Sequence, residues 1–502
     1  MATAHLGDDT PVVDPLDKGL RRGALGLGSS VAIGLASTAP TYGLAAAIPA
    51  LSDEVGVFAP GVLLLAALPM LLVALAFREL NLHEPDSGTT FAWVSRAFGP
   101  RIGWLGGWAV VVSCLLVMGS LAQVAAAYGY LLVGADELAE SRPALLAGGL
   151  VWLALLTWIC HRGIRMTARL QVVLLLAELA ILAVFSVVAL VRALSGDALD
   201  GGAGISLAQL DPFGAGGGGL AAGLLLAVFL YWGWDTSFSI NEETRSPTRV
   251  PGVAALIAMA VLVLVFVVVA LAVVAYAGAD RAVGEGGGDV FAAFATSVLG
   301  GPGGSLLVFA VLTSAAASTQ TTILPTARTL LAMGAFGALP TAFARISPRY
   351  ASPTVATWTV GAASASLLLV FLAISEDALA DSVEATALAI CFYYALTSAA
   401  VPWYFRRHLR GGRNLLMRAV LPTLAAASMT ALFVASGVVL ADADESESSV
   451  LGVGTPVVVA VAAFAVGVAI LAAQHRRNAG FFAGPLAGPG DEVGDSRVRL
   501  RE

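Results

Sequence analysis

Long apolar stretches recur along the whole of this 502-residue chain and constrain its fold more than any other feature. Each is long enough to cross the ~30 Å hydrocarbon core of a bilayer as a helix. Only 12% of the residues are charged, against about 25% in soluble proteins. We therefore predict an all-α integral membrane protein with twelve transmembrane helices. The predicted spans are residues 24–51, 57–77, 102–133, 144–160, 170–193, 219–241, 252–278, 303–333, 354–374, 384–404, 415–440 and 450–473.

Basic residues predict the orientation of these spans. With the N-terminus inside, 24 of the 27 basic residues lie on the cytoplasmic side, and only Arg142, Arg192 and Arg281 lie outside. We expect both termini to be cytoplasmic, with a tail at 1–22 and another at 478–502, largely disordered. Because Lys18 is the only lysine, the arginine bias is typical of a GC-rich bacterial genome. This indicates the bacterial cytoplasmic membrane.

Composition also excludes several classes of function. A net charge of −7 without a basic stripe predicts no nucleic-acid partner. The three cysteines lie inside apolar runs, which predicts free buried thiols, no metal site and no cofactor. There is no HExxH motif and no buried nucleophile–base pair, so we expect no catalytic residues and no enzyme activity. The expected partners are a small-molecule substrate, the lipid bilayer and, through the last spans, a second copy in a homodimer.

Two of the predicted spans are interrupted near their middle. The first contains Pro40 within the stretch Gly34–Gly43, and the sixth contains the polar stretch Trp232–Asp235. A carboxylate beside a glycine within an apolar run is costly unless it is used. Matching breaks in corresponding helices of inverted halves are the best sequence pointer to a transporter's binding site.

The breaks define the predicted domain organisation. Residues 23–405 form a transport core of two inverted five-helix repeats, about 23–195 and 216–405, and residues 414–473 form two accessory helices. Short amphipathic segments at 91–99 and 291–296 echo one another, and the numbering of the spans puts them on opposite faces.

Four stretches resemble the amino acid permeases of the amino acid–polyamine–organocation superfamily. They are Ser29–Leu51, Glu84–Gly107, Tyr231–Pro251 and Thr321–Tyr350, within a resemblance that covers about 20–475. The resemblance implies a 5+5 inverted-repeat fold, like that of sodium:leucine transporters, plus two accessory helices. It also implies alternating access around a site between helices one, three, six, eight and ten.

Two departures from this family pattern concern the site. Where relatives often have a Gly-Ser-Gly break whose amides take a substrate carboxylate, this chain has Ser37-Thr38-Ala39-Pro40, and proline lacks an N–H. Where many proton-coupled relatives have a lysine in the fifth helix, this chain has Glu178, so the lysine-based coupling scheme does not carry over unchanged. Glu178 lies close to mid-membrane, where burial disfavours the charged form of a carboxyl. It is either a proton carrier or a protonated structural group.

Several polar and aromatic residues are candidates for the site. Asp235 either binds a substrate amino group, accepts a proton or caps the following helix segment. The predicted substrate-binding residues are Ser37, Thr38, Ala39, Tyr42, Gln123, Trp232, Gly233, Trp234 and Asp235, with Tyr393 and Tyr394 as weaker candidates. The predicted coupling residues are Glu178, Asp235, Ser314, Ser318 and Thr319, with H⁺ favoured over Na⁺. A cytoplasmic gate is expected from Glu242 and Glu243 with Arg245 and Arg249, and from Arg96, Arg101 and Arg328.

The sequence therefore predicts a secondary active transporter for an amino acid or a related small organic amine, working by proton-coupled uptake. Three alternatives stay open. The lost Gly-Ser-Gly pattern together with Asp235 and Glu178 allows a polyamine or cationic amine permease. The others are an amino acid exchanger and, more remotely, a membrane nutrient sensor that does not transport.

Overall fold

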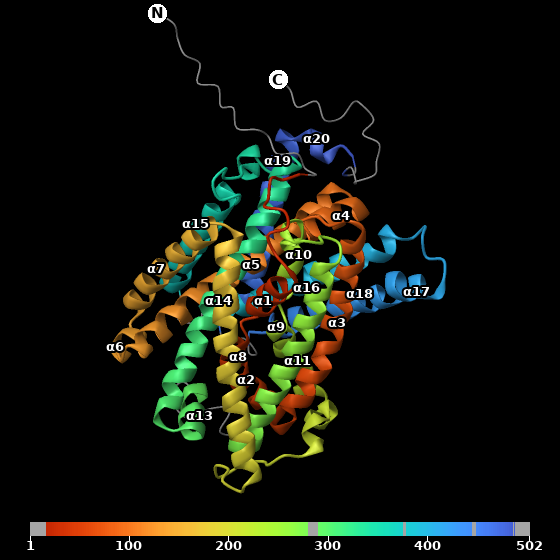
Figure 1. The fold of residues 1–502 in the computed structure, drawn as a ribbon. Coiled ribbons are helices and arrows are strands. Elements are labelled where there is room, and N and C mark those ends of the chain that lie inside the picture. The colour runs from red at the N-terminus through yellow and green to blue at the C-terminus, as the bar shows by residue number, and fades with distance from the viewer. Residues whose placement is uncertain (1–16, 280–289, 375–377, 444–447, 485, 487–502) are drawn as a thin grey trace, which may run out of the picture.

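A computed structural model describes residues 17–279, 290–374, 378–443, 448–484 and 486 as a bundle of long helices (Figure 1). The first half contains α1 (Leu27–Ser37), α2 (Pro40–Val55), η1 (Gly56–Phe58), α3 (Ala59–His83), α4 (Thr90–Phe98), α5 (Pro100–Leu132), α6 (Asp136–Ala139), α7 (Arg142–His161), α8 (Ile164–Leu194), η2 (Leu207–Leu210) and η3 (Pro212–Ala215). The second half contains α9 (Gly216–Leu230), α10 (Thr236–Ser239), η4 (Asn241–Glu243), α11 (Val250–Ala277), α13 (Val290–Leu299), α14 (Gly301–Ala335), η5 (Thr341–Ala344), α15 (Thr354–Ile374), α16 (Ala378–Tyr404), α17 (Gly412–Leu415), η6 (Leu416–Val420), α18 (Leu421–Val439), β1 (Ser449–Val450), β2 (Val453–Gly454), α19 (Thr455–Arg477) and α20 (Ala479–Phe482).

The predicted all-α membrane fold is confirmed. Within the described residues, eleven stretches are long and apolar enough to cross a membrane. The first of them, Leu27–His83, is 57 residues long and contains the interrupted helix α1/α2 followed by α3. The count of twelve crossings, the inverted repeat and the domain division stay predictions. Arg281, predicted to lie outside, is not among the described residues.

Burial separates the centre of the bundle from its lipid-facing rim. Buried residues make up 83% of the most apolar window of α14 and 78% of that of α5. The corresponding shares are only 22% for the stretch that contains α18 and 17% for α19. The last two spans therefore lie at the periphery of the bundle, and their accessory role stays a prediction.

The two short amphipathic helices form where the sequence predicts them. They are α4 and α13, and they lie at opposite ends of the bundle in Figure 1. Helix α4 packs against α5, and it is enclosed on more than one side, because Phe91 and Trp93 point about 200° apart around the helix and are both buried.

Both predicted tails are partly wrong. Lys18 and Leu20 are buried, and Leu25 pairs with Thr244 in a parallel bridge, with Leu25 N–H donating to the Glu243 carbonyl at 3.0 Å. At the other end, Phe481 in α20 stacks on Phe91 at 5.9 Å. The described parts of these tails therefore pack on the bundle, because a few apolar and charged side chains have long-range partners there.

Candidate functional site

The first predicted break is confirmed between α1 and α2. Pro40 occupies the first turn of α2, and because it has no N–H the helical ladder cannot run through it. The preceding Ala39 has a φ of 48°, in the left-handed region that non-glycine residues rarely adopt. Such strain persists only where the surroundings enforce it, and it marks functional sites more often than ordinary turns.

The second break lies between α9 and α10, at Tyr231–Asp235, one residue earlier than predicted. Gly233 has a φ of 122°, and a Cβ on it would come within 2.6 Å of the Ser37 carbonyl oxygen. The Ser37 hydroxyl also lies 2.8 Å from the Thr236 hydroxyl. The two breaks therefore touch one another, and only glycine permits this approach.

Glu178 reaches this junction from α8. Its side chain is fully buried, and its Oε1 accepts a hydrogen bond from Thr41 N–H at 2.7 Å. Thr41 lies in the first turn of α2, where free amides and the helix dipole favour a negative group. Among the described residues, Oε2 of Glu178 has no hydrogen-bond partner. A buried carboxyl thus ties α8 directly to the break of the first helix.

Two hydroxyls of α14 contact the same break. Ser314 Oγ accepts from Tyr42 N–H at 3.2 Å, and Ser318 Oγ donates to the Ser37 carbonyl at 3.3 Å. Thr319 does not join them: its hydroxyl donates to Ala315 O and accepts from Trp152 Nε1 of α7. Successive helical residues point about 100° apart, which is why Ser318 faces the break and Thr319 does not.

The amides at the start of α2 are therefore already occupied by the protein. Pro40 has none, Thr41 N–H donates to Glu178, and Tyr42 N–H donates to Ser314. Gly43 N–H donates to the Ala39 carbonyl at 2.7 Å. The Thr38 hydroxyl donates to the carbonyl of Leu35 in α1. In this arrangement the break offers an anion no unused backbone donor in the first turn of α2.

Asp235 faces the tyrosines of α16 rather than capping α10. Its Oδ2 accepts from the Tyr393 hydroxyl at 2.8 Å, and α10 has no side-chain N-cap hydrogen bond among the described residues. Trp232 Nε1 donates to the same Tyr393 hydroxyl at 2.6 Å. Asp235 and Trp232 are only partly buried. The capping alternative is thereby replaced by a Trp–Tyr–Asp chain that links the second break to α16.

The two tryptophans of this break have different surroundings. Trp234 is fully buried and stacks on Tyr394 with ring centroids 5.5 Å apart, inside an aromatic cluster with Phe77. Trp232 instead packs beside Ala39 and Tyr42. Trp234 is therefore a packing residue, and of the two rings only Trp232 adjoins both breaks.

Helix α5 contributes the third side of the junction. The Tyr42 hydroxyl lies 2.9 Å from the Ser120 hydroxyl. Gln123 is one turn further along α5, and its buried Oε1 has no hydrogen-bond partner among the described residues. Ser120 was not predicted from the sequence, because a serine in an apolar helix is as often a packing residue as a ligand.

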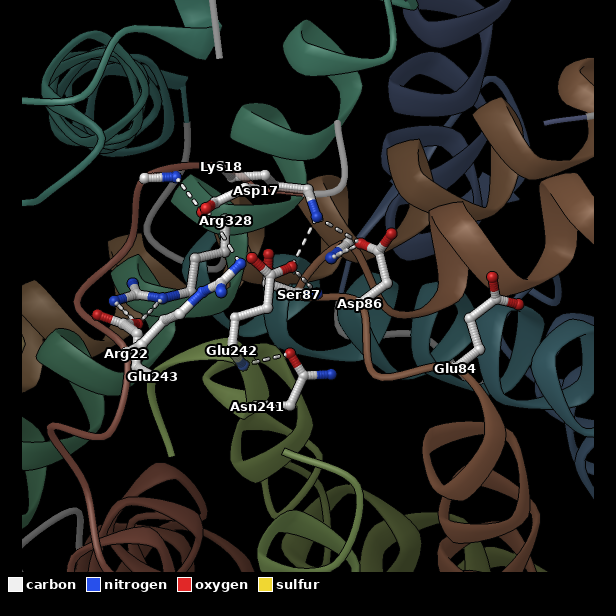
Figure 2. Close-up of polar contacts among 12 residues, drawn as sticks. Asp17, Lys18, Arg22, Glu84, Asp86, Ser87, Asn241, Glu242, Glu243 and Arg328 are labelled. Carbon is white, nitrogen blue, oxygen red and sulfur yellow. Dashed lines mark hydrogen bonds and ion pairs between the residues drawn. The ribbon is translucent and has the colours of Figure 1, made fainter. Parts of the chain in front are cut away.

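A buried ionic network joins the segment before α1 to the connection between α3 and α4 and to η4 (Figure 2). Lys18 Nζ lies 2.6 Å from Glu242 and 3.0 Å from Asp86. Arg96 pairs with Asp86 and, at 2.7 Å, with Glu84. A second ion pair joins Glu243 to α14, with Arg328 Nε donating to Glu243 Oε2 at 2.7 Å.

The charges around Lys18 and Asp86 favour the ionised form of these two groups. Burial raises the pKa of the Asp86 carboxyl, but the cations Lys18 and Arg96 outweigh it, and the pKa lies below its usual value. Burial likewise lowers the pKa of the Lys18 ammonium, and the carboxylates of Asp86 and Glu242 outweigh it, so the pKa is raised. The ion pair of Lys18 with Asp86 therefore persists at neutral pH.

Of the residues predicted to form the gate, Glu242, Glu243, Arg96 and Arg328 form ion pairs here, and the gate itself stays a prediction. Arg245, Arg249 and Arg101 are exposed and form no ion pair within the described part of the chain. Lys18 was missed because it precedes the first span in a segment predicted to be a tail. Its only sequence signal was that it is the single lysine.

Two interrupted helices that meet around buried polar groups within a helical membrane bundle are the architecture of a membrane transport protein. The chain belongs to the amino acid permease family, because the family model described as "Amino acid permease" matches residues 25–471. Members of this family are transporters rather than enzymes.

Three similar proteins are named for three different substrates. The chain is 24% identical to the methylthioribose transporter of Bacillus subtilis, over 68% of this chain and 72% of the relative. It is 26% identical to the branched-chain amino acid permease BcaP of Lactococcus lactis, over 40% and 46% of the two chains. It is 27% identical to the vacuolar cationic amino acid transporter 4 of Arabidopsis thaliana, over 73% and 61%. The last two matches span only about half to three fifths of those relatives.

Proposed function

We propose that this protein is a proton-coupled secondary transporter that takes up an amino acid or a related small organic amine by alternating access. The names of the relatives support a small organic cargo, and two of the three are amino acid carriers. The observation that carries the coupling part is the 2.7 Å hydrogen bond from Thr41 N–H to the buried carboxyl of Glu178.

This hydrogen bond links proton binding to helix movement. An ionised carboxylate accepts a hydrogen bond from an amide about twice as strongly as a neutral acceptor does. Protonation of Glu178 therefore loosens the tie between α8 and the first turn of α2. Because the Ser37 end of the same break packs against Gly233, a change at Glu178 reaches the α9–α10 break as well.

The substrate's positive group has a binding partner at the second break. Asp235 supplies a carboxylate for an ammonium group, and Trp232 beside it supplies a ring face for a cation–π contact. Tyr42, which packs beside Trp232, and Ser120 and Gln123 of α5 offer further polar groups.

The occupied amides of α2 favour a second candidate, a permease for cationic amines without a carboxylate. A substrate carboxylate would have to displace Glu178 or Ser314 to reach an amide in the first turn of α2. A diamine or an amino alcohol has no carboxylate, so it needs only a partner for its ammonium group, which Asp235 supplies. Competition of labelled leucine, arginine and putrescine in proteoliposomes separates the two: the first proposal expects an amino acid to win, and the second expects putrescine to win.

The coupling proposal is tested with Glu178→Gln, which keeps the shape of the side chain and cannot carry a proton. We expect the variant to retain substrate binding by thermal shift but to lose acceleration of uptake by an inward proton gradient. Glu54→Gln is the matched control, since Glu54 is exposed at the far end of α2. An undiminished proton response in Glu178→Gln, or a response to a sodium gradient instead, would rule out Glu178 as the carrier.

The same proposal includes a topology. We propose both ends on the cytoplasmic side of a bacterial membrane, with the ionic network of Figure 2 as the cytoplasmic gate. The positive-inside distribution of arginines supports this orientation. Reporter fusions after residue 502 test it: a periplasmic signal would reverse the assignment of the gate.

A further inference from the structure

A basic pocket lies outside the transport site, at the end of the bundle where the arginines gather. It has a volume of about 160 Å³. Its lining contains four arginines, from the segment before α1, the turn between α7 and α8, the first turn of α8, and the loop between α14 and α15. The lining residues are Arg21, Arg162, Gly163, Ile164, Arg165, Arg349 and Tyr350.

The positive charge of this pocket is largely uncompensated within the described part of the chain. No described carboxylate lies within ion-pair distance of Arg162, Arg165 or Arg349. Arg21 acts electrostatically on Glu243, but that carboxylate is already paired with a cation of α14. Four like charges around one small cavity repel each other, so the arrangement favours an anion that neutralises them.

The walls of the pocket are held in place. Gly163 has a φ of 100°, and a Cβ on it would lie 2.7 Å from the Tyr350 carbonyl oxygen, so the two loops touch through their backbones. The guanidinium of Arg162 lies 4.3 Å from the centre of the Trp158 ring, and that of Arg349 lies 5.3 Å from the Tyr350 ring. Stacking on aromatic rings orients a guanidinium and reduces the entropy lost on binding.

Two partly exposed tryptophans lie close to this pocket. Trp158 on α7 contacts Arg162 of the pocket, and Trp358 on α15 contacts the neighbouring His161; 39% and 44% of their surfaces are exposed. Tryptophans concentrate at the membrane–water interface, where arginine clusters attract anionic headgroups. Guanidinium forks match the oxygens of a phosphate group in pairs.

We propose that this pocket binds a phosphate group of net negative charge, supplied by an anionic phospholipid headgroup or by soluble phosphate. The bound phosphate would join the segment before α1, the start of α8 and the loop between α14 and α15. Arg21 follows Lys18 of the ionic network by three residues, and Arg165 lies on α8, which carries Glu178. Occupancy therefore stabilises the arrangement in which the ionic network is closed.

The test compares two triple variants of the full-length protein in detergent. The pocket variant carries Arg162→Gln, Arg165→Gln and Arg349→Gln. The control removes the same charge from exposed arginines of the α16–α17 connection and α17, with Arg407→Gln, Arg410→Gln and Arg413→Gln. Native mass spectrometry measures the Kd of each variant for phosphatidylglycerol and for phosphatidylcholine. Thermal shift at constant ionic strength measures the Kd for inorganic phosphate.

We expect at least tenfold weaker phosphatidylglycerol binding in the pocket variant and less than a twofold change in the control. If the pocket variant also loses binding of inorganic phosphate, the pocket binds a soluble ligand as well as the lipid. If only phosphatidylglycerol binding depends on the pocket, the ligand is the lipid. Equal losses of binding in both variants would overturn the proposal. It would also be overturned if the unmodified protein showed no preference for phosphatidylglycerol over phosphatidylcholine and did not bind phosphate. Where the triple variant melts early without ligand, the exposed single variant Arg165→Gln replaces it, with a threefold loss expected.

Discussion

Replacing Gly233 by alanine tests whether the two helix breaks really touch. In the structure a Cβ at this position would lie 2.6 Å from the Ser37 oxygen, 2.7 Å from its carbonyl carbon and 2.9 Å from the Thr38 nitrogen. All three are backbone atoms, so no side-chain rotation relieves the contact. The φ of 122° also puts an L-residue in a region that it rarely adopts.

The expected loss of stability in Gly233→Ala is the sum of a backbone cost and a packing cost. Holding a non-glycine residue in such a backbone conformation costs about 1–3 kcal/mol. Overpacking against a rigid wall costs about 1–3 kcal/mol more. We therefore expect Gly233→Ala to destabilise the arrangement with both breaks in contact by about 2–6 kcal/mol, a large part of a typical stability of about 5–15 kcal/mol.

Thermal unfolding in detergent and uptake into proteoliposomes measure this effect. We expect a lower melting temperature for Gly233→Ala and loss of most of the uptake. Gly437→Ala is the matched control, because Gly437 lies inside α18 and a Cβ added there would have no neighbouring atom within 4 Å. Alanine there should leave stability unchanged or raise it by roughly 0.5–1 kcal/mol, as in other helix interiors. A Gly233→Ala protein as stable and active as the control would refute the close contact of the breaks.

Two further predictions concern the ionic network. Arg328→Met leaves Glu243 buried without its partner and should lower the free energy of unfolding by about 3–5 kcal/mol. In chemical unfolding, Arg328→Met combined with Glu243→Leu should be less destabilising than either single change. Additive losses of stability would contradict the pairing. Because the pKa of Asp86 is held below its usual value, its contribution to stability is intact above pH ~4 and is lost as the pH falls through the lowered pKa. Lys18→Met should therefore move the acid loss of melting temperature to higher pH, and an unshifted pH profile would argue against the Lys18–Asp86 pair.

The sequence alone determined the membrane fold and the positions of both breaks. Span length and apolarity are properties of consecutive residues, so they can be read without knowing any partner. Pro40 cannot continue a helical ladder, and Gly233 beside Asp235 interrupts an apolar run, so each break has a local cause. Glu178 was predicted at mid-membrane for the same reason, by counting residues along one helix.

Only the tertiary structure decided which of these residues face one another. Trp232 and Trp234 are two positions apart and equally aromatic, yet one adjoins the breaks and the other is packed against Tyr394. Lys18 gained a role that its place before the first span did not indicate, because Asp86 and Glu242 lie 68 and 224 residues away along the chain. Partners at such separations depend on how the helices rotate and pack, and no local pattern encodes that rotation.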